Sequence, residues 1–382
     1  MSRLPEPVLL MGTGLIGTSV ALALRRGGAD VLLSDADPAA VEVAVARGAG
    51  RPGPADLGHA SLVGSADLAE PHTPPTTWTE QPGLVVVAVP PTATAGAVAE
   101  ALRRFPSAFV TDVTSVKQPV LRALHGAGIA ADRYVGGHPM AGREVSGPGA
   151  ASAELFADRP WVLAPHAQSD PAAVQAATSL ALAVRALPVV MDPAEHDRAV
   201  AVVSHVPQVI SSLLAARLLD VPEDSVRIAG QGLRDMTRIA ASDPALWVDI
   251  LTANARPVTD VLTSLRDDLD HLVRSLRSAD LGSEEQLAQA LSRGNAGFER
   301  IPGKHGAGST GPTSIVPVAV PDRPGSLGRL FAAVADAGCQ IEDIRIEHAL
   351  GRPTGVVQMT VAVAAAGPLS AALSAAGWDV RA

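Results

Sequence analysis

The first half of the chain alternates short apolar runs with helical patterns, and this alternation restricts the fold more than any other feature of the sequence. The runs are nearly continuous in valine and leucine, which is typical of parallel strands covered on both faces. They are residues 8–12, 31–35, 84–90, 108–113, 133–137, 161–165 and 188–192. We therefore predict an α/β fold with a Rossmann-like doubly wound sheet over residues 1–192, whose ligand crevice lies at the carboxyl ends of the strands. The Pro-, Gly- and Thr-rich stretch 51–83 predicts a loop with one weak strand near Leu62.

Beyond residue 192 the pattern changes to long helical segments with apolar residues three and four apart. These segments predict an all-α domain over residues 193–300, and because such helices are hard to cover within one small bundle, we expect a homodimer interface there. Gly, Ser, Pro and Thr dominate residues 301–313, which predicts a linker. Residues 314–382 follow a strand, helix, two strands, helix, strand order, which predicts a small α+β ferredoxin-like domain.

Charge and cysteine content exclude several kinds of partner and site. The net charge is −9 with 30 basic residues, which disfavours nucleic acid and anionic membranes, since both are bound by clustered Lys and Arg. The single cysteine, Cys339, excludes an internal disulfide and a cysteine-cluster metal site, as expected in a reducing compartment. The N-terminal apolar run is too short for a signal peptide or a membrane span. We therefore predict a cytoplasmic protein.

The segment GTGLIG, residues 12–17, follows one predicted strand and opens a helix, which is the context of a dinucleotide-binding turn. Gly12 allows the tight turn, Gly14 lets a pyrophosphate approach the backbone, and Gly17 lets the helix pack on the strand. The phosphates would meet the free N–H groups and the positive end of that helix. The alternative is that the glycines only form a strand-to-helix turn of another doubly wound protein.

The nature of the dinucleotide follows from Asp35, which ends the second predicted strand. A carboxylate there accepts hydrogen bonds from the ribose hydroxyls and repels a 2′-phosphate. No Arg or Lys lies between Asp35 and Arg47 to neutralise such a phosphate, so we predict NAD as the cofactor. Four more residues, beside the glycines and at the end of the third predicted strand, are assigned to the same site: Leu15, Ile16, Val89 and Pro90.

Two polar side chains follow predicted strands at their carboxyl ends. Ser115, in TDVTSVK, faces the predicted crevice or, alternatively, forms the N-cap of the helix that follows. His138 lies in GGHPMAG, where Gly137 and Pro139 restrict the backbone. An imidazole is the side chain best suited to take a proton near neutral pH, so His138 is a candidate base. The alternative is a turn histidine bonded to a backbone carbonyl.

The helical domain carries further candidates. Pro207, in VVSHVPQ, cannot donate to the carbonyl of Val203, which predicts a helix kink and a free carbonyl beside His205. His205 is a candidate ligand-binding residue, with a core histidine as the alternative. Arg234 and Arg238 lie one helical turn apart, where like charges repel, so they are candidates for binding a substrate carboxylate. The alternative is a solvated surface pair.

Taken in order, these motifs resemble the prephenate dehydrogenase family of tyrosine biosynthesis. The resemblance runs over residues 8–300 and rests on GTGLIG, TDVTSVK, GGHPMAG followed by E and SG, VVSHVP, and RDMTRIAASDPALW. It implies that His138 bonds to the ring hydroxyl of the substrate with support from Ser115. It further implies that His205 is the family's second histidine and Arg238 its carboxylate-binding arginine. Two further residues are implied at the pocket or its gate: Glu144 and Ser146.

The resemblance implies NAD-dependent oxidative decarboxylation of prephenate to 4-hydroxyphenylpyruvate. His138 would draw the hydroxyl proton while hydride leaves C4 for NAD, and the growing ketone would pull electrons from the bond to the departing CO2. Arg238 would orient the ring carboxylate, and neither a metal nor a covalent nucleophile is needed. Arogenate, the aminated analogue, is the alternative substrate. Arg143, a cation beside Glu144, disfavours the ammonium group of arogenate, so we predict prephenate.

The C-terminal domain, with VPDRPGSLGRLF between its first strand and helix, resembles an ACT domain, a module that commonly binds amino acids. The expected effector is tyrosine, the end product of the implied pathway, with phenylalanine and tryptophan as alternatives. The residues assigned to this regulatory site are Asp322, Gly325, Ser326 and Leu327.

Two hypotheses of other kinds remain. The ACT-like domain would also suit a non-catalytic regulator that binds NAD and an amino acid, although the intact set of Ser115, His138 and Arg238 disfavours it. A general hydroxy-acid dehydrogenase would share the cofactor site, but it would have no use for the helix motif around Arg238.

Overall fold

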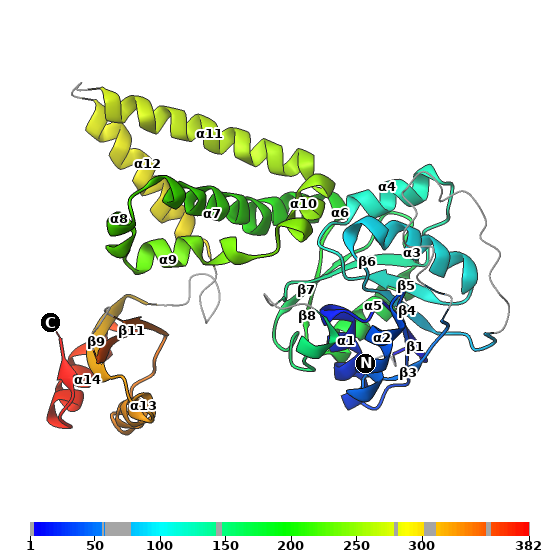
Figure 1. The fold of residues 1–382 in the computed structure, drawn as a ribbon, viewed down its shortest axis with the longest axis horizontal. Coiled ribbons are helices and arrows are strands. Elements are labelled where there is room, and N and C mark those ends of the chain that lie inside the picture. Colours follow the sequence, from blue (N-terminus) through cyan, green and yellow to red (C-terminus); the bar gives the residue numbers. More distant parts are fainter. Residues whose placement is uncertain are drawn as a thin grey trace. The chain divides into compact units, whose positions relative to one another are not determined.

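The computed structural model describes residues 4–55, 57, 78–142, 147–278, 282–301, 311–348 and 353–381. The chain divides into two compact units, Met1–Leu265 and Arg266–Ala382 (Figure 1). The first unit holds a sheet domain and most of the helical segments, and the second ends in a smaller sheet. The weak strand proposed near Leu62 and residues 302–310 of the proposed linker lie outside the described residues.

The first unit is built on an eight-stranded sheet with the order β3-β2-β1-β4-β5-β6-β7-β8. Its strands are β1 (Val8–Met11), β2 (Val31–Ser34), β3 (Arg51–Pro52), β4 (Leu84–Val87), β5 (Phe109–Asp112), β6 (Tyr134–Pro139), β7 (Pro160–Ala164) and β8 (Leu187–Val190). Every predicted apolar run forms a strand, which confirms the doubly wound fold, and the short strand β3 was not predicted. The order of strands reverses on either side of β1, which is where such folds bind ligands.

Two expectations about the far end of the sheet were wrong. The expected parallel arrangement fails at β7, which pairs antiparallel with β6. The described part of the connection between these strands has a short 3₁₀ turn, η3 (Pro148–Ala150), in place of the crossover helix that parallel neighbours need. Strand β8 was expected to be buried, yet Val190 is 63% exposed. Because β8 is the last strand of the sheet, it has a neighbour on one side only.

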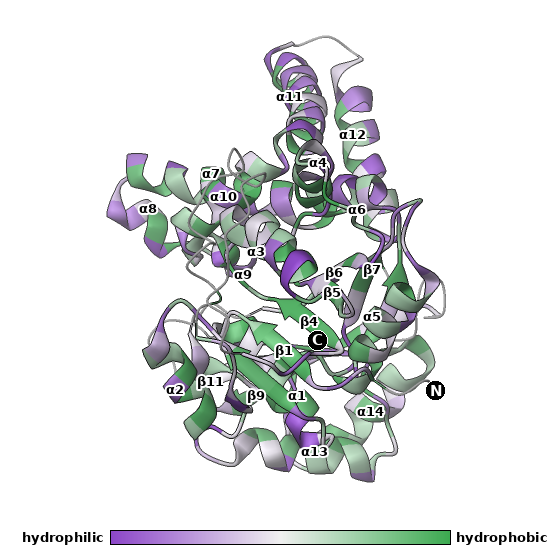
Figure 2. Cartoon of the chain, turned by 90° about the vertical axis from the view of Figure 1, so that its right-hand side faces the viewer, coloured by the Kyte–Doolittle hydropathy of each residue, from purple (hydrophilic) through white to green (hydrophobic). Residues whose placement is uncertain are grey.

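Both faces of the sheet are covered by helices. Successive side chains of each strand point to opposite faces, so each strand contributes to two hydrophobic clusters. In β1, Val8 and Leu10 join one hydrophobic cluster and Leu9 and Met11 join another. The central strands are correspondingly apolar (Figure 2). The covering helices are α1 (Leu15–Arg26), α2 (Pro38–Ala46), α3 (Pro91–Arg104), α4 (Gln118–Gly126) and α5 (Pro171–Ala183).

Between Pro193 and Phe298 the described residues form helices joined by short turns, with no strand among them, as predicted. The helices are α6 (Pro193–Val200), the π-helix η4 (Ala201–His205), α7 (Val206–Arg217), η5 (Leu218–Asp220), α8 (Glu223–Arg227), α9 (Gln231–Thr237), η6 (Arg238–Ala241), α10 (Pro244–Ala253), α11 (Ala255–Arg277) and α12 (Ser283–Phe298). Within the described residues, Pro193–Asp220 is the one helical stretch long and apolar enough to cross a membrane by length and composition.

The second unit ends in a four-stranded antiparallel sheet with the order β10-β11-β9-β12. Its elements are β9 (Thr313–Pro321), α13 (Ser326–Asp336), β10 (Asp343–His348), β11 (Thr354–Ala362), α14 (Val363–Ala375) and β12 (Asp379–Val380). Side chains of β9 and β11 pack with those of both helices in one hydrophobic cluster. This is the sequence of strands and helices expected for the C-terminal residues.

Candidate active site

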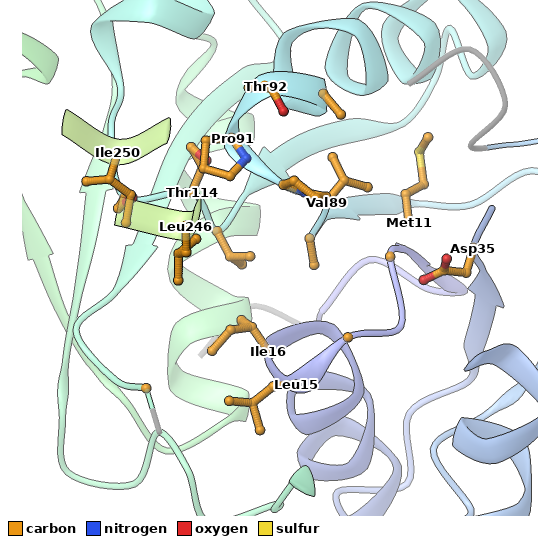
Figure 3. A pocket seen from close by; sticks show the side chains of 18 of the residues that line it. Met11, Leu15, Ile16, Asp35, Val89, Pro91, Thr92, Thr114, Leu246 and Ile250 are labelled. Carbon is orange, nitrogen blue, oxygen red and sulfur yellow. The ribbon is translucent and has the colours of Figure 1, made fainter. Parts of the chain in front are cut away.

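A cavity of about 1170 Å³ lies at the carboxyl ends of the central strands of the first unit. Asp35 and Met11 stand at one end of it, Leu15 and Ile16 lie along one wall, and side chains of α10 close the other end (Figure 3). Nine of the residues assigned from the sequence line it: Gly12, Gly14, Leu15, Ile16, Asp35, Val89, Pro90, Ser115 and His138. The structure therefore brings the cofactor motif and the candidate base into one cavity.

The glycine turn has the shape that a bound pyrophosphate requires. Gly12 has φ +104°, and a Cβ at this position would collide with the carbonyl of Ala88 at the end of β4. A Cβ at Gly17 would collide with the carbonyl oxygen of Gly12, so the start of α1 packs directly on the turn. A Cβ at Gly14 would meet no atom within 4 Å, so the backbone there is open to a ligand. Gly14 is also the N-cap of α1 and offers no side chain to its N–H groups.

Asp35 is held in place from two sides. Its Oδ2 accepts hydrogen bonds from the backbone N and the hydroxyl of Thr13, the latter at 2.9 Å. Its Oδ1 accepts from the backbone N of Asp37 at 2.9 Å. The carboxylate is thus fixed beside the glycine turn, where it fits the ribose of a dinucleotide.

Ser115 is not a helix cap. Helix α4 begins at Gln118 with Lys117 as its N-cap residue, two positions beyond Ser115. The N–H groups of Lys117 and Gln118 instead donate to the two carboxylate oxygens of Asp197, at 2.8 and 2.9 Å. Ser115 lines the cavity together with His138.

The two glycines before His138 allow a close approach of two strands. A Cβ at Gly137 would collide with the backbone carbonyl of Asp112 in β5. A Cβ at Gly136 would lie 2.8 Å from the Cδ atom of Lys117, which runs beneath β6. The Nζ atom of Lys117 donates to Asp112 Oδ2 at 2.6 Å and to the Gly137 carbonyl. The backbone constraint around His138 therefore makes room for a buried ion pair behind it.

This ion pair is completely enclosed. Lys117 and Asp112 are 1% and 0% exposed, and the hydroxyl of Tyr134 donates to Asp112 Oδ1 at 3.1 Å. Burial lowers the pKa of Lys117 from its ordinary value, and the neighbouring Asp112 carboxylate works against that shift. Burial, followed by the charge of Asp112, raises the pKa of Tyr134 well above 10. Neither group lines the cavity, and both hold the Asp112 carboxylate through hydrogen bonds.

His138 is the first member of a chain of hydrogen bonds. Its Nδ1 lies 2.8 Å from Nε2 of His196, and Nδ1 of His196 lies 2.8 Å from Oδ1 of Asp197. Burial lowers the pKa of His138 well below 6.5, with smaller contributions from His196, Lys117 and His205. The ring is therefore neutral at physiological pH, and one of its two nitrogens carries a lone pair.

His205 lies close to the cavity rather than in its wall. Its Nδ1 is 3.0 Å from Nδ2 of Asn254, which also donates to the backbone carbonyl of Asp197 at 2.8 Å. The ring of His205 meets that of Trp247, a cavity residue, edge to face with centroids 6.1 Å apart. Burial lowers the pKa of His205 to about 4. Where a kink was expected beside Pro207, the structure has the π-helix η4, a wider turn that is frequent at functional sites.

The structure does not bring the two arginines to this cavity. Arg234 in α9 and Arg238 at the start of η6 are both exposed, and neither lines the cavity. The residues just beyond them do, since Ser242 and Asp243 form part of its wall. Arg143, Glu144 and Ser146 lie outside the described residues.

Several residues of the site were not predicted. His196 and Asp197 occur in AEHDRAV, 58 residues from His138, and their polar side chains at the start of an apolar helix are the only local signal. Lys117 lies inside the quoted segment TDVTSVK but was assigned no role. Asn254 and Trp247 carry no signal that separates them from other polar or aromatic residues of the helices.

The proposed regulatory loop lies in the second unit. Asp322 donates its backbone N–H to the carbonyl of Pro353 at 2.9 Å. Gly325 has φ +82° and is the N-cap of α13. Ser326 is 1% exposed and accepts a hydrogen bond from Nη2 of Arg329, whereas Leu327 is 37% exposed.

The chain is similar to known proteins over most of its length. Residues 68–190 match the family described as prephenate dehydrogenase, nucleotide-binding domain, and residues 192–293 match prephenate dehydrogenase, dimerization domain. The chain is 37% identical to the probable prephenate dehydrogenase NovF of Streptomyces niveus, over 92% of this chain and 93% of that protein. It is 28% identical to a prephenate dehydrogenase of Bacillus subtilis, over 94% of this chain and 93% of that protein.

Two solved structures are similar over the greater part of the chain. Prephenate dehydrogenase from A. aeolicus in complex with hydroxyphenyl propionate and NAD+ is 27% identical with a TM-score of 0.64, covering 77% of this chain and 97% of that one. Synechocystis arogenate dehydrogenase is 26% identical with a TM-score of 0.60, covering 76% of this chain and 99% of that one.

Proposed function

Because the chain belongs to the prephenate dehydrogenase family, we propose that it catalyses the NAD-dependent oxidative decarboxylation of prephenate to 4-hydroxyphenylpyruvate. The observation that carries the proposal is the shared cavity. His138 lines the same space as Gly14 and Asp35, so a base and a dinucleotide site face one another. The relatives named as prephenate dehydrogenases support the choice of substrate.

The residues present fit NAD. The open backbone at Gly14 and the start of α1 suit the pyrophosphate, and the fixed carboxylate of Asp35 suits the ribose hydroxyls. When bound, NAD supplies the hydride acceptor. The A. aeolicus relative was crystallised with NAD+, which supports the same cofactor here.

The chain's own residues perform the rest of the reaction. His138 accepts the proton of the substrate's C4 hydroxyl, and Ser115 supports the same hydroxyl from the neighbouring strand end. Leu246, Trp247 and Ile250 of α10 form an apolar wall that reduces the access of water to the reacting ring. Loss of the hydroxyl proton and of hydride makes C4 ketone-like, which draws electrons from the bond to CO2 and makes the ring aromatic as a phenolate. His138 then returns the proton to this oxygen, which gives the hydroxyl of the product.

We also propose which residues bind the ring carboxylate of the substrate. Arg238 would bind the ring carboxylate, with His205 and Arg234 nearby and Glu144 and Ser146 at the pocket or its gate. Arg238 lies four residues before Ser242, which lines the cavity. A rearrangement of η6 or the approach of a second subunit would be needed to bring the guanidinium to the substrate.

The decisive experiment is a comparison of substrates. Purified protein is expected to oxidise prephenate with a kcat/KM about tenfold or more above that for arogenate, because the cation Arg143 disfavours an ammonium group. NADH formation with each substrate, measured with NAD and with NADP side by side, gives the answer. A preference for arogenate would replace prephenate by the substrate named for the Synechocystis relative. Turnover of neither compound would favour a non-catalytic regulator.

We propose a homodimer formed through the helical segment. Residues 192–293 match a dimerization domain, and about a third (33%) of the 18-residue apolar window within Pro193–Asp220 is buried within the chain. Val203 and Leu213 of this stretch are 65% and 59% exposed, and a second subunit would cover them. The location we propose for this dimer is the cytoplasm.

We also propose that residues 1–192 form the NAD-binding domain, residues 193–300 the substrate and dimerisation domain, and residues 314–382 an ACT-like regulatory domain. The β-α-β-β-α-β order and the β10-β11-β9-β12 sheet support the last assignment. Tyrosine would bind at the loop from Asp322 to Leu327. A thermal-shift screen of the twenty amino acids, repeated without residues 314–382, tests this. A shift with none of them removes the proposal.

A further inference from the structure

The chain of hydrogen bonds behind His138 is buried at its inner end. His196 and Asp197 are 0% and 3% exposed, while His138 lies at the cavity wall. The contacts from His138 Nδ1 to His196 Nε2 and from His196 Nδ1 to Asp197 Oδ1 are both 2.8 Å long. His196 thus lies between the candidate base and a carboxylate, with each ring nitrogen facing one of them.

The positions of the protons follow from the partners. Asp197 Oδ1 also accepts from the backbone N of Lys117, so it is an acceptor, and Nδ1 of His196 must carry a proton to bond to it. In the neutral ring, Nε2 of His196 is then an acceptor, and Nδ1 of His138 must be the donor. The remaining nitrogen of His138, Nε2, therefore carries a lone pair. The hydrogen bonds through His196 to Asp197 therefore select the tautomer of His138 in which Nε2 is a proton acceptor.

We propose that His196 is a positioning and proton-relay residue: it fixes the tautomer of His138 and takes over the positive charge when His138 accepts the substrate proton. This inference rests on the proposed function, since it describes the base of that reaction. The relay ends at Asp197, whose carboxylate would pair with the imidazolium of His196.

The charges around His138 favour such a transfer. The neighbours that face its ring are His196 of α6, Lys117 before α4 and His205 of η4, and each disfavours a positive charge on His138. Lys117 is paired with Asp112, which offsets part of its effect. His196 is in direct contact with the carboxylate of Asp197, and among the described residues no carboxylate makes such a contact with His138. A proton taken from the substrate is therefore more stable one ring further from the cavity.

The step balances in protons and charge. The C4 hydroxyl proton forms a bond to Nε2 of His138, and the proton on Nδ1 of His138 passes to Nε2 of His196. After this transfer His138 is neutral and in the other tautomer. His196 is then an imidazolium, and its Nδ1 proton stays hydrogen-bonded to Asp197. The hydride would leave with its electron pair to NAD, and the electrons of the bond to CO2 would pass through the ring to the oxygen on C4, giving a phenolate. The proton then returns along the same two rings to this oxygen, which forms the product hydroxyl and leaves both histidines as they began.

Two substitutions separate the roles. In His196→Gln the side-chain oxygen can still accept from His138 Nδ1, but it cannot carry a charge. We expect kcat for prephenate to fall about a hundredfold, with KM for prephenate and NAD within about threefold of the wild type. His196→Leu also removes the acceptor, so we expect kcat to fall about a thousandfold because His138 is no longer held in one tautomer.

The tautomer itself is observable without substrate. In ¹⁵N-histidine spectra of the full-length protein, His138 is expected to carry its proton on Nδ1 in the wild type and in His196→Gln, and on Nε2 in His196→Leu. His125→Gln, an exposed histidine at the end of α4, is the matched control and should keep the wild-type kcat and spectrum.

The outcomes distinguish this inference from the proposed function. If wild-type protein fails to oxidise prephenate, the function is wrong, while the spectra still test the hydrogen-bonded chain. If His138 of the wild-type protein carries its proton on Nε2, the proposed series of hydrogen bonds from His138 to Asp197 is wrong. This result does not depend on whether the substituted proteins fold. A His196→Gln protein with wild-type kcat shows that no charge passes to His196, which overturns the relay.

Discussion

Lys117→Met tests whether the buried ion pair behind β6 supports the candidate base. The substitution keeps much of the side-chain length but removes the Lys117 ammonium, the cation that pairs with the Asp112 carboxylate. Asp112 is 0% exposed, so its charge would stay out of contact with water. The donors that remain are the hydroxyl of Tyr134 at 3.1 Å and the backbone N–H groups of Thr114 and Gly137 at 3.1 and 2.9 Å.

The cost follows from the loss of one partner of a buried pair, which is about 3 to 5 kcal/mol because the other charge is left uncompensated. The three remaining hydrogen bonds place the expected value near the lower end, at about 3 kcal/mol. Pairing Lys117→Met with Asp112→Asn removes the stranded charge. The double variant is therefore expected to be less destabilised than the sum of the two single variants by about 1.5 kcal/mol or more.

Urea unfolding measured by the fluorescence of tryptophan gives the free energy of unfolding, and Trp161 in β7 is a fully buried reporter of this sheet. The matched control is Arg51→Met, which removes an exposed guanidinium 2.9 Å from Asp30 and is expected to cost less than about 1 kcal/mol. A Lys117→Met protein as stable as this control would refute the reasoning, because it would mean that water or a rearranged donor reaches Asp112.

Three further outcomes concern the cofactor site and the pH response. Gly12→Ala is expected to weaken NADH binding about tenfold or more in a fluorescence titration, since its Cβ meets the carbonyl of Ala88. Asp35→Asn should lower the ratio of kcat/KM with NAD to that with NADP about tenfold, and an unchanged ratio would contradict its role. The pKa of His205, about 4 in the folded chain against 6.5 ordinarily, means that the folded state binds this proton less readily than the unfolded chain. The contribution of His205 to the free energy of unfolding is therefore fully present above pH 6.5 and is lost as the pH falls toward 4. The loss is up to about 2 kcal/mol after allowing for solvent screening. In urea unfolding measured at each pH, His205→Asn should lack this part of the loss.

The strands and the glycine turn could be predicted because their signals are local. A buried strand needs an apolar run, and the close contact of Gly12 with Ala88 needs a residue without a side chain. The direction of β7 and the exposure of β8 have no such signal. They depend on how the chain returns after β6 and on which strand ends the sheet, and apolar composition is the same in either case.

The hydrogen bonds that link His205 to Asp197 could not be predicted for a related reason. His196 and His205 are nine residues apart, which is about two and a half turns of an ideal α-helix, so the sequence places them on opposite faces. The π-helix η4, which begins at Ala201 and ends at His205, changes this register. Asn254 then contacts both His205 and the backbone carbonyl of Asp197. A prediction from regular α-helix geometry would place His196 and His205 on opposite faces of one helix. The π-helix changes this, so that hydrogen bonds through Asn254 link His205 to the residue next to His196.

Asp197 explains why the base depends on the helical segment as well as on the sheet. Its carboxylate accepts from His196 and from the first N–H groups of α4, next to the turn that holds Ser115, and its carbonyl accepts from Asn254. One residue thus connects the ring behind His138, the turn with Ser115 and the partner of His205. Residues in one hydrogen-bonded network do not act independently. Loss of His196 and loss of Asn254 should therefore reduce kcat by less together than the product of their separate effects, because either change removes a partner of Asp197, one at its carboxylate and the other at its backbone carbonyl.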